Sequence, residues 1–273
     1  MKMGGKARFL LAFLFSGLTL AGAAHAATCG NDTSGFERWK VAFAQEAQAR
    51  GVGPRALNAL AGTTYAHKTI AADRGQKSFK LSLKEFMQKR GSAAIVSQGK
   101  KHKAQRAALF DRIERKYGVP AGPLIAIWGM ETGFGRFMGD QNIISAVATL
   151  AYDCRRSEFF TGHLYAALEL IDRGILSPQD RGAAHGEIGQ TQFLPGSVLK
   201  YGVDEDGDGK IDLIHSVADA LASTANFLRA HGWRPGAGYQ MGEPNFAAIQ
   251  GWNAASVYQQ AIALMGRDID GGR

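Results

Sequence analysis

The sequence predicts a mainly α-helical protein whose mature part is a single domain, and three observations support this prediction. Apolar residues recur every three or four positions in successive segments, which is the spacing of amphipathic helices. Glycine or proline follows many of these segments and ends them. No internal repeat, low-complexity tract or Pro/Ser-rich linker divides the chain. The only β-structure that we expect is at most a short hairpin near the acidic stretch that starts at residue 204.

The first 26 residues have the features of a secretory signal peptide. A short basic region precedes an apolar run, and Ala24-His25-Ala26 supplies the small-residue cleavage site. The run is too short to span a bilayer, which takes roughly 20 residues. We therefore expect cleavage after Ala26, a periplasmic protein without stable membrane insertion, and a monomeric domain over residues 27–273.

The charge of the chain argues against nucleic acid as a partner. The formal net charge is +8, and three of the positive charges lie in the signal peptide, which leaves +5 for the mature chain. A mildly basic protein suits an anionic polymer or envelope surface, whereas nucleic-acid binding requires a concentrated basic face. Cys29 and Cys154 could form one disulfide in an oxidising compartment, but the sequence does not show that they meet.

Helices are expected along most of the mature chain. The first places Phe36, Trp39, Phe43 and Ala47 on one face and ends at Gly51. Asn142 is a candidate N-cap for a helix over 143–152, and Ser216 is one for a helix over 216–229. The other expected helices cover residues 55–60, 78–89, 104–117, 155–173 and 253–265.

One carboxylate, Glu131, ends an apolar helix that has Pro123 in its first turn. Leu124, Ile127 and Trp128 share its helical face. A carboxylate in such surroundings is desolvated, which disfavours the anion and raises the pKa. It can then hold a proton and deliver it to a leaving oxygen as a general acid. Taken alone, the pattern fits equally well a helix-end glutamate that reaches solvent.

The acidic stretch 204–212, DEDGDGKID, matches the first nine positions of an EF-hand loop. Clustered carboxylates repel one another unless a hard cation neutralises them, and calcium is the natural candidate. His215 stands where the loop usually has a bidentate Glu, so Asp219 would complete the cage, unless it only caps a helix with Ser216. We expect a structural calcium ion held by Asp204, Asp206, Asp208, Lys210, Asp212 and Asp219.

Several other chemistries are excluded by missing motifs. The chain has no H-E-x-x-H, no C-x-x-C, no P-loop and no G-x-S-x-G. The glycines after Glu131 follow a helix instead of a strand, which argues against a dinucleotide site. We expect no cofactor in catalysis.

Separated motifs, in order along the chain, carry a resemblance to a known family. They are YGVPAGPLIAIWGMETGFGRFMG at 117–139, ATLAYDCRRSEFF at 148–160, GQTQFLPGS at 189–197, DEDGDGKIDL at 204–213, ADALASTANFLRAHGW at 218–233, and the pair Trp252-Asn253. Together they resemble the membrane-bound lytic transglycosylase B family of murein transglycosylases. The resemblance covers residues 39–258 and implies a lysozyme-like transglycosylase fold.

The resemblance also implies a reaction and its residues. The expected substrate is the β-1,4 bond between N-acetylmuramic acid and N-acetylglucosamine in peptidoglycan glycan strands, cleaved without water to leave 1,6-anhydromuramoyl ends. Glu131 would act as both acid and base. The residues implied in substrate binding are Arg155, Arg156, Gln192, Phe193, Trp252 and Asn253. Of these, Arg156 and Phe193 could instead be fold elements, and Trp252 could belong to the core.

One departure from the family leaves alternatives open. Where the family commonly shows Ser-Trp-Ala-Gly-Ala-Met-Gly, this chain reads Ala-Ala-His-Gly-Glu-Ile-Gly at 183–189. A hydroxyl is missing, and Glu187 becomes a candidate second carboxylate of the kind that hydrolytic glycosidases use. The alternatives are a muramidase that uses water and a calcium-stabilised peptidoglycan-binding module without activity.

Overall fold

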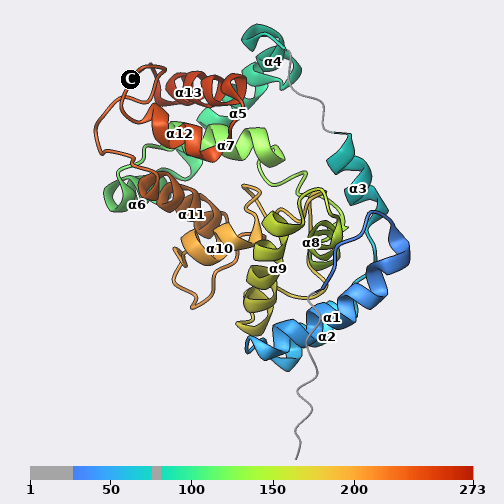
Figure 1. Cartoon of the computed structure of the whole chain (residues 1–273). Coiled ribbons are helices and arrows are strands. Elements are labelled where there is room, and N and C mark those ends of the chain that lie inside the picture. Colours follow the sequence, from blue (N-terminus) through green and yellow to red (C-terminus); the bar gives the residue numbers. More distant parts are fainter. Residues whose placement is uncertain (1–26, 76–80, 273) are drawn as a thin grey trace, which may run out of the picture.

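The computed structural model describes residues 27–75 and 81–272, and it confirms the mainly helical prediction (Figure 1). The predicted signal peptide lies outside the described residues. Within those residues, no helix is both long and apolar enough to cross a bilayer. In chain order the helices are α1 (Phe36–Ala49), α2 (Pro54–Ala61), α3 (His67–Arg74), α4 (Leu83–Lys89), α5 (Ser92–Gln105), α6 (Ala107–Tyr117), α7 (Ala121–Thr132), α8 (Ile143–Tyr152), α9 (Ser157–Asp172), α10 (Pro195–Tyr201), α11 (Val217–Ala230), α12 (Phe246–Trp252) and α13 (Ser256–Asp270).

The helices form two groups, which are visible in Figure 1. In one group α13 and α5 pack along α7, and α11 and α12 adjoin them. In the other group α8 packs against α9, and α1, α2 and α3 cover this pair. The helix α10 contacts both α9 and α11. The two most apolar helices lie one in each group, because every residue of α8 and every residue of α7 except Glu131 is buried.

Caps seen in the sequence are present in the structure. The Asn142 side chain accepts a hydrogen bond from Ser145 N at 3.0 Å and so caps α8. The Ser216 hydroxyl accepts one from Asp219 N at 3.2 Å and caps α11. Both side chains satisfy backbone N–H groups that a helix start leaves unpaired.

Four helices, α3, α5, α10 and α12, were not predicted, and α5 shows why. It buries only Ile95 and Gly99, so it lacks the apolar periodicity that would indicate a helix. Its contact with the core depends on the small size of Gly99, where an added Cβ would lie 2.8 Å from Ile125 Cγ2. Close packing therefore holds this helix, and such packing leaves little trace in the sequence.

The β-structure lies at a different place from the one predicted. The strands β1 (Gln141–Asn142) and β2 (Arg181–Gly182) form an antiparallel pair, while residues 204–219 contain no strand. In the acidic loop, backbone N–H groups donate to carboxylates instead of to a neighbouring strand. Gly207 N, for example, donates to Asp204 Oδ1 at 2.6 Å.

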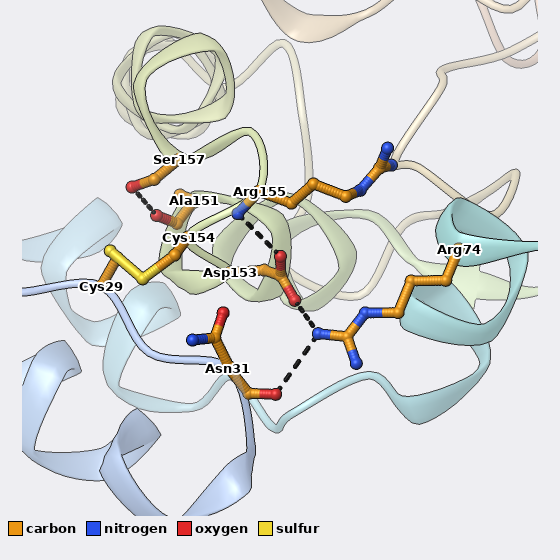
Figure 2. Close-up of a disulfide and its surroundings, with 8 residues drawn as sticks. All are labelled: Cys29, Asn31, Arg74, Ala151, Asp153, Cys154, Arg155 and Ser157. Carbon is orange, nitrogen blue, oxygen red and sulfur yellow. Dashed lines mark hydrogen bonds and ion pairs between the residues drawn. A yellow bond between two sulfur atoms is a disulfide. The ribbon is translucent and has the colours of Figure 1, made fainter.

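A disulfide joins Cys29 to Cys154 and settles the question that the sequence left open (Figure 2). Next to it, Gly30 N donates to Tyr152 O at 2.9 Å, and Cys154 N donates to Gly30 O at 3.1 Å. Gly30 must be small here, because a Cβ would lie 2.0 Å from Tyr152 Oη. The first described residues are therefore fixed to the end of α8.

Removing this disulfide should lower stability. The bond closes a loop with a sequence separation of 125 residues and so restricts the unfolded chain. We expect the Cys29→Ser/Cys154→Ser double variant to lose about 2–4 kcal/mol of unfolding free energy in urea titrations. A reducing agent should destabilise the wild type similarly and leave the variant unchanged. Equal stability of the oxidised wild type and the variant would contradict the prediction.

Candidate active site

Glu131 is the next-to-last residue of α7 and the one residue of this helix that is only partly buried. The helix ends at Thr132 because Gly133 adopts a left-handed conformation (φ 57°), which terminates the helix at low cost. Trp128, one turn earlier, is fully buried. The apolar helix thus brings a carboxylate to the edge of the core, as the sequence indicated.

Two side chains from the C-terminal helices hold one oxygen of this carboxylate. Tyr258 Oη donates a hydrogen bond to Glu131 Oε1 at 2.6 Å, and Trp252 Nε1 donates to the same oxygen at 3.1 Å. Trp252 ends α12 and Tyr258 lies in the first turn of α13. Among the described residues, no hydrogen bond reaches Oε2. One oxygen is therefore fixed, and the other is available to a proton.

Burial raises the pKa of Glu131 above its ordinary value. The hydrogen bonds from Tyr258 and Trp252 and the charge of Arg90 favour the anion and lower the pKa, whereas the charge of Glu187 raises it. Desolvation is the largest contribution and determines the direction. Glu131 therefore keeps its proton to a higher pH than an exposed glutamate would.

Glu187 is perturbed in the opposite direction. Burial raises the pKa of this carboxyl, but the hydrogen bonds and charge of His185 outweigh burial and lower the pKa overall. His185 donates to it from its backbone N at 2.8 Å, and the ring Nδ1 lies 3.0 Å from Oε1. Two carboxyls with opposite pKa shifts are typical of paired acid and base roles, and the lysozyme pair is a known example of this pattern. Glu187 thus supplies a negative charge that acts on Glu131.

A surface hollow of about 440 Å³ opens beside Glu131. Its walls come from the turn between α4 and α5, from α5, and from the loop that follows α7. The charged and aromatic residues that line it are Lys89, Arg90, Glu131, Phe134, Arg136 and Phe137.

The Gln-Thr-Gln-Phe loop braces the end of α7. Gln190 Oε1 accepts a hydrogen bond from Trp128 Nε1 at 2.9 Å, and Gln190 O accepts one from Thr132 Oγ1 at 2.6 Å. Gln192 has a positive φ of 60° and donates its side-chain amide to Gly189 O at 2.8 Å. The backbone of Gln192 is therefore strained, and its amide nitrogen is turned toward the loop.

Phe193 is buried and makes an edge contact with the Trp252 ring, with ring centroids 5.2 Å apart. It therefore supports the Trp252 ring, which fits the alternative that Phe193 is a fold element. Its part in substrate binding stays a prediction. Asn253 Oδ1 accepts from Ala255 N at 2.9 Å, and its backbone carbonyl accepts from Gln259 at 2.8 Å. These contacts fix the turn between α12 and α13, which positions Trp252 and Tyr258.

The two arginines meet a buried carboxylate that the sequence did not single out. Asp73 of α3 is almost fully buried and pairs with both Arg155 and Arg156. Arg155 Nε donates to Asp73 Oδ2 at 2.7 Å, and His185 Nε2 lies 3.7 Å from Asp73 Oδ1. Two guanidinium groups share one carboxylate, which leaves an excess positive charge at a partly exposed site.

The acidic loop brings together three of its six predicted ligands. One oxygen from each of Asp204, Asp206 and Asp219 lies within 4.8 Å of the others. Asp208 and Asp212 do not belong to this group. Asp208 Oδ1 accepts a hydrogen bond from Lys210 N at 2.8 Å, and Asp212 Oδ2 lies 2.9 Å from His215 Nδ1. The cap is confirmed, because Asp219 N donates to the Ser216 hydroxyl, and the Asp219 carboxylate lies in the group of three. Its role as a metal ligand stays a prediction.

Sequence reasoning missed Tyr258, Arg90 and Asp73. Tyr258 fell within a predicted helix, but an aromatic residue on an apolar face indicates core, and Glu131 lies 127 positions away. Asp73 lies on α3, whose buried residues are Thr69, Ile70 and Asp73, so this helix carries too little apolar pattern to be recognised. No local signal could have identified these partners.

Comparisons with known proteins identify the family and the fold of the chain. The sequence pattern of the transglycosylase SLT domain matches residues 35–242. The membrane-bound lytic murein transglycosylase B of Escherichia coli K12 is 41% identical over 129 residues, which cover 46% of this chain and 36% of that protein. The match thus spans about a third of the length of this relative.

Solved structures share the fold over most of the chain. SltB3 from Pseudomonas aeruginosa, in complex with NAG-anhNAM-pentapeptide, superposes with a TM-score of 0.81 at 32% identity, covering 87% of this chain and 80% of that one. The Escherichia coli lytic transglycosylase Slt35 in complex with calcium has a TM-score of 0.75 at 23% identity, with coverages of 90% and 96%. Since the family pattern covers most of the sequence, the chain belongs to the transglycosylase SLT domain family.

Proposed function

We propose that this protein is a lytic transglycosylase that cleaves the β-1,4 bond between N-acetylmuramic acid and N-acetylglucosamine in peptidoglycan and leaves 1,6-anhydromuramoyl ends. The observation that carries the proposal is Glu131, a carboxyl with a raised pKa that Trp252 and Tyr258 hold by one oxygen. Family membership supports the reaction class, and the solved complexes of SltB3 contain NAG-anhNAM-pentapeptide and NAG-NAM-pentapeptide.

Glu131 serves both proton transfers of this reaction. Protonated on Oε2, it donates to the glycosidic oxygen while the bond from that oxygen to C1 of the muramoyl residue breaks. The resulting carboxylate then takes the proton of the muramoyl O6 hydroxyl as O6 bonds to C1. The acid is regenerated and no water is consumed. Trp252 and Tyr258 stabilise the transient carboxylate through Oε1 and keep their hydrogen bonds in both protonation states.

The other expected site residues are assigned roles that suit their contacts. Arg155 and Arg156 bind carboxylates of the substrate, since Asp73 neutralises only one of their two charges. Gln192 accepts a hydrogen bond from the saccharide through Oε1, since its Nε2 donates to Gly189 O. Trp252 faces the reacting sugar next to Glu131, while Phe193 and Asn253 position it. Only a few placed polar groups are needed to orient a ligand.

Replacing Glu131 tests the proposal. We expect Glu131→Gln to reduce cleavage of purified sacculi by about 10²–10⁴-fold or more, because the amide cannot donate or accept the catalytic proton. The control is Glu114→Gln, at an exposed glutamate of α6, which should keep wild-type activity. Circular dichroism of both variants checks the fold. Retained activity in Glu131→Gln would contradict the assignment.

A water-using muramidase is the second candidate, and Glu187 is the observation that favours it. This carboxylate stays charged to low pH and acts on Glu131 by its charge. Mass spectrometry of the wild-type products decides between the two reactions. Anhydro ends support the transglycosylase, and reducing ends support the muramidase. The absence of any released product would support a peptidoglycan-binding module without activity.

The hydrogen bond from Tyr258 predicts a pH effect. It lowers the pKa of Glu131, so Tyr258→Phe should raise this pKa further. Cleavage needs the protonated acid and is lost as the pH rises through its pKa. The alkaline limb of kcat/KM should therefore move to higher pH in Tyr258→Phe, although the maximal rate falls. Tyr239→Phe, which removes a hydrogen bond to Asp270 instead, should leave the limb in place. An unchanged or lower alkaline limb in Tyr258→Phe would refute the assigned role.

We infer that the acidic loop holds a structural calcium ion. The support is the gathered oxygens of Asp204, Asp206 and Asp219 and the calcium complex of Slt35. Carboxylate oxygens are ligands that calcium prefers, and the positions of the loop follow the EF-hand order. Lys210 would contribute its backbone carbonyl, and Asp208 and Asp212 would complete the shell.

Calcium should raise the melting temperature. An ion that binds only the folded state at 100 times its Kd adds about 2.7 kcal/mol, which corresponds to a shift of several degrees for a domain of this size. Calorimetry with calcium and with a chelator measures this shift. We expect Asp219→Asn to abolish it and Asp111→Asn, at an exposed position of α6, to retain it. A wild type without the shift would contradict calcium binding.

The cellular setting that we propose is the periplasm. The signal-peptide pattern of residues 1–26 supports export, and the disulfide between Cys29 and Cys154 is stable in an oxidising compartment. The substrate, peptidoglycan, is found there. We propose that the mature protein acts as a monomer.

A further inference from the structure

The hollow beside Glu131 contains an aromatic ring, Phe137, and cations to which the mechanism above assigns no contact with the substrate. Phe137 has 73% of its surface exposed and is the most exposed of the four large apolar side chains that lie open in the described residues. Exposed apolar rings cost free energy in water and often mark binding surfaces. Phe137 lines the same hollow as Glu131.

The backbone around the end of α7 fixes the position of this ring. Phe137 N donates to Thr132 O at 2.9 Å, which folds the loop back on the helix end. The ring lies against Gly133, where an added Cβ would be 3.1 Å from Phe137 Cδ2. Phe137 is therefore held at the helix end that also carries Glu131, although its outer face is open.

The charged residues around the ring are mainly basic. Lys89 and Arg90 lie at the end of α4, and Arg136 lies next to Phe137 in the chain. Arg136 is fixed, because its Nε donates to Gly133 O at 2.9 Å and its Nη2 donates to Gln98 Oε1 at 3.2 Å. Glu131 is the one carboxyl among the lining residues. The hollow therefore favours an anionic ligand.

We propose that this hollow is a saccharide subsite adjoining the cleavage point, in which Phe137 stacks on a pyranose ring and Arg90 and Arg136 bind the carboxylates of the stem peptide that a muramoyl residue carries. A pyranose presents a flat face of C–H groups that packs on an aromatic ring, and guanidinium groups form charge-assisted hydrogen bonds to carboxylates. A peptide-bearing glycan offers both features together. This proposal rests on the proposed function, because it names the part of the substrate that the site holds.

Binding to the inactive Glu131→Gln protein tests the ring without depending on the reaction. Titration calorimetry with peptide-bearing muropeptide fragments should show about tenfold weaker binding when Phe137→Ala or Phe137→Leu is added. Phe137→Leu is informative because leucine is apolar but lacks a flat ring. Phe137→Trp keeps a flat ring and should bind as the parent does. Met241→Ala is the matched control, since this side chain is 70% exposed and does not line the hollow. Unchanged affinity in both Phe137→Ala and Phe137→Leu would overturn the proposal.

The charged part of the subsite has its own test. Arg136→Gln should weaken binding of peptide-bearing fragments about tenfold and leave binding of N-acetylglucosamine oligomers, which carry no carboxylate, nearly unchanged. Equal effects on both ligands would refute recognition of the stem peptide. In active enzyme, Phe137→Leu should raise KM with little change in kcat. If the wild type releases no product, the proposed function fails, while the titrations still decide whether the subsite exists.

Discussion

The site depends on the hydrogen bonds that tie Glu131 at the end of α7 to Trp252 and Tyr258 at the C-terminal helices. The helix α7 is apolar and buried, so it can deliver a carboxyl to the edge of the core but cannot satisfy it. Its partners must come from elsewhere in the chain. The packing of α13 along α7 brings them within reach, and this makes the core contact between the two helices a condition for the chemistry.

Two opposed effects set the proton affinity of that carboxyl. Desolvation raises the pKa, and the two hydrogen bonds with the charge of Arg90 lower it. If burial acted alone, the acid would hold its proton too firmly to release it, and if the hydrogen bonds dominated, it would be an anion unable to donate. A residue that donates and then recovers one proton needs an intermediate affinity. The negative charge of Glu187, whose carboxylate contacts His185, raises the pKa of Glu131 and so adds to the effect of burial.

Sequence patterns predicted the parts of the structure that local chemistry determines. The apolar helix before Glu131, the caps Asn142 and Ser216, and the spacing of carboxylates in the acidic loop are all local features. What the sequence could not show are contacts between distant segments. Tyr258 approaches Glu131, and Asp73 approaches Arg155 and Arg156, only because helices pack. The sequence left open whether Phe193 binds substrate or is a fold element, and its burial against Trp252 is decided by the same packing.

Hydrogen bonds through Gln190 connect the acidic loop to α7. Leu213 O accepts a hydrogen bond from Gln190 N at 2.9 Å, and Ile214 O accepts one from the Gln190 side chain at 2.9 Å. Gln190 in turn accepts hydrogen bonds from Trp128 and Thr132 of α7, which lie one turn before Glu131 and directly after it. Repulsion among unneutralised carboxylates would therefore act through Leu213 and Ile214 on the brace that holds the end of α7. The calcium ion that we propose for the loop would stabilise that brace, and an ion outside the hollow would in this way contribute to the order of the Glu131 carboxyl.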